Sequence, residues 1–248
     1  MVDIQQLTPR DVARKMDYAV LNRAGGETEI LDACANVRKY RFAAFHVLPC
    51  WVPTLVRELG AFAREHAVEL GAPVAFPYGT ASSEAKRREA ETLIEAGATA
   101  LDMVANVGWL LDGRLDRYER ECRDHMGICR EAGINAKVII EVGYLDERQV
   151  ATAAGIVAAC GADFVKTATG TGPVGRPNLR DVLVIQRVLA ESGGSGVRTG
   201  VKVSGIAEPR IMVAYGFIRM GADRIGTRAA PLIVDALPEV QRTLFTGM

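Results

Sequence analysis

Three lysines stand inside short apolar runs of a chain that otherwise uses arginine for positive charge. The 248 residues contain 30 lysines and arginines, of which only six are lysines. Lys137, Lys166 and Lys202 each lie among β-branched or other apolar residues, a pattern that predicts strands. The pKa of an amine, unlike that of a guanidinium, can fall far enough for the group to act as a nucleophile. These lysines therefore indicate nucleophilic chemistry.

Strand alternation predicts which side chains share the interior. Successive side chains of a strand face opposite ways. In residues 137–142 one alternate set is wholly apolar, and we expect it to pack against helices. The same rule applies to the runs 100–104, 164–166 and 201–203. The side chains that it directs inward are Lys137, Ile139, Glu141, Asp102, Lys166 and Lys202.

Such an interior favours proton-transfer chemistry around an amine. Burial lowers the pKa of a lysine, and a second cation nearby lowers it further. Lys166 and Lys202, if they lie on adjacent strands, form such a pair, with Asp102 across the barrel to move protons. The other interpretation is that the lysines sit at strand ends, reach solvent and pair with Asp102 and Glu141.

A repeating unit positions these strands. A step of Gly, a small residue and a polar residue or proline precedes several apolar runs, and Gly favours the left-handed turn that ends a helix. Most steps are roughly 25 to 35 residues apart, the length of one strand and helix. They begin at Gly71, Gly97, Gly133, Gly161 and Gly221.

Eight strands are predicted, with helical segments between them. One such helix spans Ser82 to Ala96, with Ser82 as its N-cap and Lys86 mostly off its apolar face. Alternating strands and helices favour a parallel sheet, and eight strands in about 250 residues favour an α/β fold of the (β/α)8 TIM barrel type. We expect one domain over residues 1–248, with residues 1–15 as a helical cap or extension. The expected strands are Met16 to Leu21, Phe42 to Leu48, Val74 to Phe76, Ala100 to Ala105, Lys137 to Val142, Phe164 to Thr167, Gly200 to Ser204 and Arg224 to Gly226.

Composition argues against several classes of protein. Basic and acidic residues number 30 each, so no field of one sign favours nucleic acid or anionic lipid as a partner. We find no apolar run of the length of a membrane span or signal peptide. The five cysteines form no CxxC pair, which favours reduced thiols and a cytoplasmic protein. His46, His66 and His125 fit no metal-ligand spacing, and we interpret each as a surface or satisfied core residue.

The charged strands resemble those of the deoxyribose-phosphate aldolase family, from about residue 12 to residue 230. FVKTATG at residues 164–170 is similar to the family's Schiff-base motif FVKTSTG, and DMVANVG at 102–108 to its DMVINIG segment. KVIIE at 137–141, the Val-Lys pair at 201–202, RIGT at 224–227 and the Met-Asp pair at 16–17 resemble the neighbouring strands.

The resemblance implies reversible cleavage of 2-deoxy-D-ribose 5-phosphate to D-glyceraldehyde 3-phosphate and acetaldehyde. It implies a Schiff base on Lys166, proton transfer by Asp102 and Lys202, no metal or other cofactor, and a homodimer. It also implies substrate binding by Lys137, Thr169, Gly170, Thr171, Gly205, Gly226, Arg228 and Asp17.

The departures from the family pattern concern the anion pocket. Residues 204–208 read Ser-Gly-Ile-Ala-Glu where the family usually has Ser-Gly-Gly-Ile-Arg. Arg228 and Ala229 replace two serines, and Arg228 offers a bidentate fork for a phosphate or a carboxylate. Ala19 stands where a threonine is usual, and His46 where a cysteine is common. Gly-rich residues 169–172 remain.

Three other hypotheses stay open. The first is a Schiff-base aldolase for a different phosphorylated or carboxylated aldehyde, favoured by Ile206 and Arg228. The second is a barrel isomerase or epimerase in which inward carboxylates act as acid and base and the lysines are purely electrostatic. The third is a sugar-phosphate sensor without catalysis, which would have no need of an amine with a low pKa.

Overall fold

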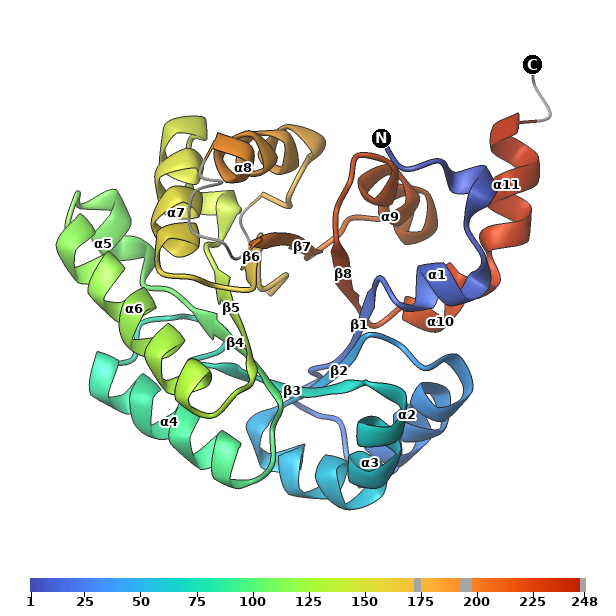
Figure 1. Cartoon of the computed structure of the whole chain (residues 1–248), viewed down its shortest axis with the longest axis horizontal. Helices are drawn as coiled ribbons and strands as arrows, with labels where there is room; N and C mark the ends of the chain where they lie inside the picture. Colours follow the sequence, from blue (N-terminus) through green and yellow to red (C-terminus); the bar gives the residue numbers. More distant parts are fainter. Residues whose placement is uncertain (172–174, 192–197, 246–248) are drawn as a thin grey trace.

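Eight parallel strands pair in chain order around a closed barrel in the computed structural model, which describes residues 1–171, 175–191 and 198–245. The last strand pairs with the first, so the predicted (β/α)8 barrel is confirmed. Figure 1 shows the strands at the centre and the helices around them. The strands are β1 (Met16–Val20), β2 (Ala44–Val47), β3 (Glu69–Val74), β4 (Ala100–Val104), β5 (Asn135–Ile139), β6 (Phe164–Lys166), β7 (Gly200–Ser204) and β8 (Arg224–Thr227).

Helices connect these strands and cover the outside of the barrel. In the part of the chain that the structure describes, no helix is long and apolar enough to cross a membrane. Short 3-10 helices span Ile4–Gln6, Pro49–Trp51 and Val142–Tyr144. The α-helices are α1 (Pro9–Ala13), α2 (Glu27–Tyr40), α3 (Val52–His66), α4 (Ser83–Glu95), α5 (Val107–Leu111), α6 (Leu115–Glu131), α7 (Glu147–Ala159), α8 (Leu179–Glu191), α9 (Arg210–Arg219), α10 (Ala230–Asp235) and α11 (Leu237–Phe245).

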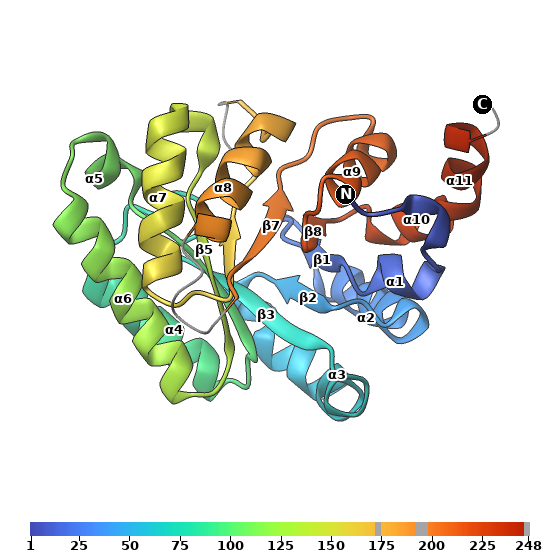
Figure 2. The ribbon, with the colours of Figure 1, turned by 45° about the horizontal axis from the view of Figure 1, so that its top comes forward.

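The segment before the first strand is helical and packs near the end of the chain. Thr8 and Asp11 form a reciprocal capping box at the start of α1. Helix α1 contacts α10, and both views show the two helices beside the seam between β1 and β8 (Figures 1 and 2). The Gln241 side-chain amide donates to the carbonyls of Ile4 and Leu7, which ties α11 to the N-terminal segment.

Four of the five predicted helix-ending glycines have the expected backbone. Gly97, Gly133, Gly161 and Gly221 have φ angles between 64° and 96°. Gly71 is the exception, because it lies inside β3 and the prediction of a strand at 74–76 is wrong. Helix α3 ends instead at Ala67, which takes the left-handed conformation (φ 51°) without a glycine. Because an alanine and not a glycine follows α3, the glycine pattern did not predict that β3 begins at Glu69.

The outward faces of the strands form the core between barrel and helices, as alternation predicts. Leu101, Met103, Val138 and Ile140 are each at most 1% exposed and belong to one apolar cluster. Alternate residues of the same strands must then point into the barrel.

Helix α4 begins as predicted but buries an unexpected charge. The Ser82 hydroxyl accepts a hydrogen bond from the Ala85 N–H, which confirms the N-cap. The expectation that Lys86 lies off the buried face is wrong, since the side chain is 3% exposed. Its Nζ donates to the Val104 carbonyl at 2.7 Å and lies 2.8 Å from the Glu121 carboxylate. This buried ion pair joins α4, α6 and the end of β4.

We expect Lys86→Met to lower the free energy of unfolding by about 3–5 kcal/mol, because Glu121 would keep a buried charge without its partner. Urea unfolding followed by circular dichroism measures the change. Arg88→Met on the same helix is the control, since Arg88 forms only exposed pairs and should cost less than about 1 kcal/mol. Equal losses for the two variants would contradict a special role for the buried pair.

Candidate active site

A cavity of about 410 Å³ opens where the strands end and their following loops begin. Its walls come from β1, β2, β3, β4, β6, β7 and β8 and from the segments after several of them. In (β/α)8 barrels this carboxyl-terminal face carries the active site. The volume falls within the usual range for a small-molecule site.

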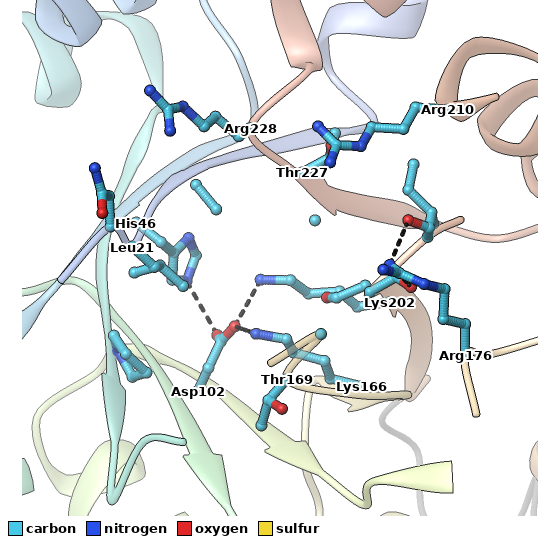
Figure 3. A pocket seen from close by; sticks show the side chains of 18 residues that line it. Leu21, His46, Asp102, Lys166, Thr169, Arg176, Lys202, Arg210, Thr227 and Arg228 are labelled. Carbon is cyan, nitrogen blue, oxygen red and sulfur yellow. Dashed lines mark hydrogen bonds and ion pairs between the residues drawn. The ribbon is translucent and has the colours of Figure 1, made fainter. Parts of the chain in front are cut away.

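Two of the three predicted interior lysines meet one carboxylate at the base of this cavity. Lys166 and Lys202 are paired in register on β6 and β7. Their Nζ atoms lie 2.8 Å and 2.6 Å from the same oxygen, Oδ2 of Asp102. Figure 3 shows both side chains converging on Asp102. The expected inward grouping is confirmed, and Asp102 on β4 reaches both lysines by direct hydrogen bonds.

A second polar layer lies beneath this group. Lys202 Nζ is 2.7 Å from Asp17 Oδ2, and Lys137 Nζ is 3.1 Å from Glu69. Arg224 joins both carboxylates, at 2.7 Å from Asp17 and 3.0 Å from Glu69. Lys137 and Asp17 are fully buried, and neither lines the cavity.

The charges of this network do not balance. Among the described residues it joins four cationic side chains to three carboxylates. Lys137, Lys202 and Arg224 each approach two carboxylates, whereas Lys166 contacts Asp102 alone. Lys166 is therefore the cation whose proton is held least firmly.

The pKa values follow from this imbalance. Burial, with Lys202 beside it, lowers the pKa of Lys166 to about 8 although Asp102 opposes the change. Burial would also lower the pKa of Lys137, but Glu69 and Asp102 raise it above the ordinary lysine value. Burial favours the neutral form of Asp102, yet His46, Lys166 and Lys202 hold its pKa well below the usual range. A neutral amine is thus accessible at Lys166, next to an ionised carboxylate.

Glu141 lies outside this group. Strand β5 ends at Ile139, so the alternation that directs Glu141 inward stops before it. The Glu141 backbone is left-handed (φ 55°), and its carboxylate accepts hydrogen bonds from the Thr169 N–H at 3.1 Å. Glu141 therefore holds the loop after β6.

Two predicted glycines bring the loops after β6 and β7 together. Gly170 and Gly205 both have φ of 77°, and a Cβ on Gly170 would lie 2.8 Å from Gly205 Cα. Only glycine fits such a contact between backbones. Both line the cavity with Thr169, whereas Thr171 lies outside the lining and approaches the Thr169 hydroxyl at 3.1 Å. Gly172 of the predicted loop lies outside the described residues.

Gly226 leaves space for the second lysine. It lines the cavity on β8, and a Cβ there would lie 3.0 Å from Lys202 Cε and 2.6 Å from Ser204 Oγ. A side chain on Gly226 would thus push Lys202 away from Asp102.

Three arginines surround the mouth of the cavity. Arg228 was predicted there, and its side chain is 60% exposed and pairs with Glu29. Arg176 and Arg210 also line the cavity, although the sequence reasoning missed them. Arg176 donates to the Gly205 and Ile206 carbonyls at 3.3 Å and 3.1 Å. Figure 3 shows Arg228 and Arg210 on the side opposite Asp102 and Arg176 to the right of Lys202, so the mouth suits an anion.

His46 is another lining residue that was not predicted as part of the site. It is 2% exposed, and its Nε2 lies 3.0 Å from Asp102 Oδ1. The interpretation of His46 as a surface or satisfied core residue is wrong, because its Nδ1 has no partner among the described residues. Alternation along β2, applied as it was to the lysine strands, would have directed His46 inward.

A buried amine of lowered pKa on a barrel strand, hydrogen-bonded to a carboxylate, is the arrangement of a class I aldolase. Comparison with known proteins agrees with this assignment. Residues 12–205 match the model of the DeoC/LacD family of aldolases. The chain belongs to this family, and it is an aldehyde-lyase that acts on a carbon–carbon bond.

Named relatives cover nearly the whole chain. A deoxyribose-phosphate aldolase of Bacteroides thetaiotaomicron is 35% identical over 97% of this chain and 96% of its own. One of Methanocella arvoryzae is 36% identical over 91% of this chain and 95% of its own. The tetrameric deoxyribose phosphate aldolase of Aeropyrum pernix superposes with a TM-score of 0.81 at 26% identity, over 96% of this chain and 98% of that one.

We expect Lys166 to react with a small aldehyde at lower pH than a surface lysine does, because its pKa is lowered to about 8. Reductive methylation with formaldehyde and cyanoborohydride, followed by peptide mapping across pH 6 to 11, measures the midpoint. Lys39 is the internal control, since a hydrogen bond with Tyr40 raises its pKa. Lys202→Met should move the Lys166 midpoint upward by removing a neighbouring cation. Identical midpoints for Lys166 and Lys39 would rule out an activated amine.

Proposed function

We propose that this aldolase cleaves 2-deoxy-D-ribose 5-phosphate reversibly to D-glyceraldehyde 3-phosphate and acetaldehyde. The proposal rests on the Lys166 amine. It lies 2.8 Å from Asp102, the one carboxylate that it contacts among the described residues, at the base of a cavity whose mouth is lined by arginines. The named relatives support the choice of substrate.

In the proposed reaction the neutral amine of Lys166 attacks the aldehyde carbon C1 of the open-chain sugar. The resulting carbinolamine loses water and becomes an iminium ion. The bond between C2 and C3 then breaks, its electron pair moves to the iminium nitrogen, and the C3 hydroxyl loses a proton to give glyceraldehyde 3-phosphate. Protonation of the enamine at C2 and hydrolysis release acetaldehyde. Asp102 and Lys202 move protons while the iminium ion forms and is later hydrolysed, as their hydrogen bond of 2.6 Å allows.

The phosphate would lie at the mouth, bound by Arg228 and the backbone around Thr169, Gly170 and Gly205. Arginine binds phosphate through bidentate charged hydrogen bonds. Thr171 and Gly226 would shape this pocket from either side. Lys137 and Asp17 would act without touching the substrate, by fixing Asp102 and Lys202 from below.

A different phosphorylated or carboxylated aldehyde is the second candidate substrate. Ile206 is 4% exposed and lines the cavity after Gly205, where a second glycine would leave the backbone freer. Arg228 suits a carboxylate as well as a phosphate. Comparing cleavage of deoxyribose 5-phosphate, free deoxyribose and keto acids separates the two candidates.

The proposal extends to assembly and location. A homodimer is the form that the family resemblance implies, although the Aeropyrum pernix relative is tetrameric. A cytoplasmic location is supported by the five cysteines, all free and four of them buried.

We expect acetaldehyde and borohydride to leave a two-carbon adduct on Lys166, detected by peptide mass spectrometry. Lys166→Met should abolish the adduct and reduce cleavage of deoxyribose 5-phosphate at least about a thousandfold, because the covalent path is lost. Lys15→Met serves as control, since Lys15 lies at the other end of β1 and donates to the Ala222 carbonyl. If the parent protein turns over substrate without forming an adduct, the isomerase hypothesis is favoured. If a Lys166→Arg variant keeps its full biological effect, the sensor hypothesis is favoured.

We expect Arg228→Ala to raise KM for deoxyribose 5-phosphate about tenfold or more, because it removes a charged hydrogen bond of about 1.5–3 kcal/mol. Its kinetics on free deoxyribose should not change. Arg180→Ala is the matched control, since Arg180 is exposed and pairs with Glu147 on α7. A similar KM increase on both substrates would argue against phosphate binding by Arg228.

A further inference from the structure

His46 is fixed in the cavity wall by its neighbours on both sides. It stands on β2 in register with Gly71 of β3. A Cβ on Gly71 would lie 2.5 Å from His46 Nε2, closer than real Cβ contacts come, so the imidazole occupies the space of the missing side chain. On its other side, Nε2 lies 3.0 Å from Asp102. The ring therefore has a defined position and a defined partner.

The partner determines the tautomer. The pKa of Asp102 lies well below its usual range, so the carboxylate is ionised and only accepts hydrogen bonds. The proton of the neutral ring must then be on Nε2, which donates to Asp102. Nδ1 is left with a lone pair.

This lone pair is buried and unused. Nδ1 has no hydrogen-bond partner among the residues that the structure describes. His46 lines the same cavity as Lys166 and Lys202, and Figure 3 shows its second ring nitrogen turned away from Asp102. A buried polar atom without a partner is costly unless a ligand or water satisfies it. Among the described residues, Nδ1 is thus an unpaired acceptor of a side chain in the cavity wall.

We propose that His46 is a catalytic residue of this chain, whose Nδ1 accepts the proton of the substrate hydroxyl during carbon–carbon cleavage. This inference rests on the aldolase reaction proposed above. It concerns a residue that stands where the family resemblance places a cysteine.

The step balances in atoms and charge. Nδ1 takes the proton of the C3 hydroxyl as the bond between C2 and C3 breaks. The oxygen becomes the aldehyde oxygen of the leaving product, and the electron pair of the broken bond reaches the iminium nitrogen and forms the enamine. His46 becomes an imidazolium ion, stabilised by Asp102 at Nε2. Returning the proton to C2 of the enamine restores the neutral ring.

The neighbouring groups are poorer bases for this proton. Asp102 accepts hydrogen bonds from Lys166, Lys202 and His46, and its low pKa makes it a weak base. Lys202 donates to Asp102 and lies 2.7 Å from Asp17, so two carboxylates already engage its amine. An imidazole whose tautomer is set by a carboxylate is the usual general base of such sites.

The charged groups facing His46 from the other strands give the pH dependence its sign. They are Asp17 on β1, Asp102 on β4, Lys137 on β5 and Lys202 on β7, and β3 faces the ring with Gly71. Burial and the two lysines lower the pKa of His46 below 6.5, while Asp102 opposes them. His46 is therefore neutral at pH 7, and kcat should fall only below the ordinary histidine range.

His46→Gln tests the role, because a glutamine amide can still donate to Asp102 but has no basic nitrogen. We expect the acetaldehyde adduct on Lys166 to form as in the parent protein, and kcat for cleavage to fall at least about a hundredfold, the usual contribution of a general base. The acid limb of the kcat profile should disappear. His66→Gln on α3, outside the cavity, is the matched control and should behave as the parent.

Parental kcat and an unchanged acid limb in His46→Gln would overturn the inference and leave His46 as a positioning residue for Asp102. If His46→Gln does not fold, His46→Cys restores the residue that the resemblance implies. That variant must also lose the acid limb for the inference to hold. Absence of the adduct from the parent protein would overturn the proposed aldolase reaction itself, so the two failures are distinguishable.

Discussion

The Asp102 carboxylate, buried and shared among several donors, is the interaction on which the site depends. It accepts from Lys166 and Lys202 through one oxygen and from His46 through the other. Asp102 stands on β4 and its three donors on β2, β6 and β7, so this carboxylate joins side chains from four of the eight strands. A charge at this depth is tolerated only with such partners. The closed sheet supplies them because its inward positions converge on one axis.

Shared use of one carboxylate also explains why Lys166, of the lysines in this network, is the reactive one. Every other cation of the network has a second carboxylate within 4 Å, and Lys166 has Asp102 alone among the described residues. Pairing with carboxylates and burial have opposite effects on a lysine. Pairing prevails at Lys137 and raises its pKa, whereas burial prevails at Lys166 and lowers its pKa to about 8. A barrel interior filled with branched apolar side chains would be simpler to fold. The polar layer instead gives one amine a lower proton affinity than its neighbour Lys137.

Strand alternation in the sequence predicted site residues that lie within regular strands, and it did not predict those that lie in loops or at helix ends. Asp102, Lys166 and Lys202 lie within regular strands, so alternation directed them inward correctly. Glu141 follows the end of β5, where a left-handed residue breaks the alternation. Arg176 lies before α8 and Arg210 begins α9, where neither strand nor helix period predicts direction. Gly71 misled because glycine inside a strand and glycine after a helix look alike in sequence. In the structure, Gly71 lies inside β3 in register with His46 and lacks the positive φ of the helix-ending glycines.

That register makes the identities of residues 46 and 71 depend on each other. An imidazole at 46 reaches Asp102 because its neighbour on β3 carries no side chain, and any Cβ at 71 would meet the ring within 2.8 Å of three of its atoms. A smaller side chain at 46, such as a cysteine, would leave room there. Histidine at 46 therefore requires glycine at 71, whereas glycine at 71 does not require histidine. The glycine weakens the strand by its extra backbone freedom. This cost is the physical reason to regard the imidazole as part of the site.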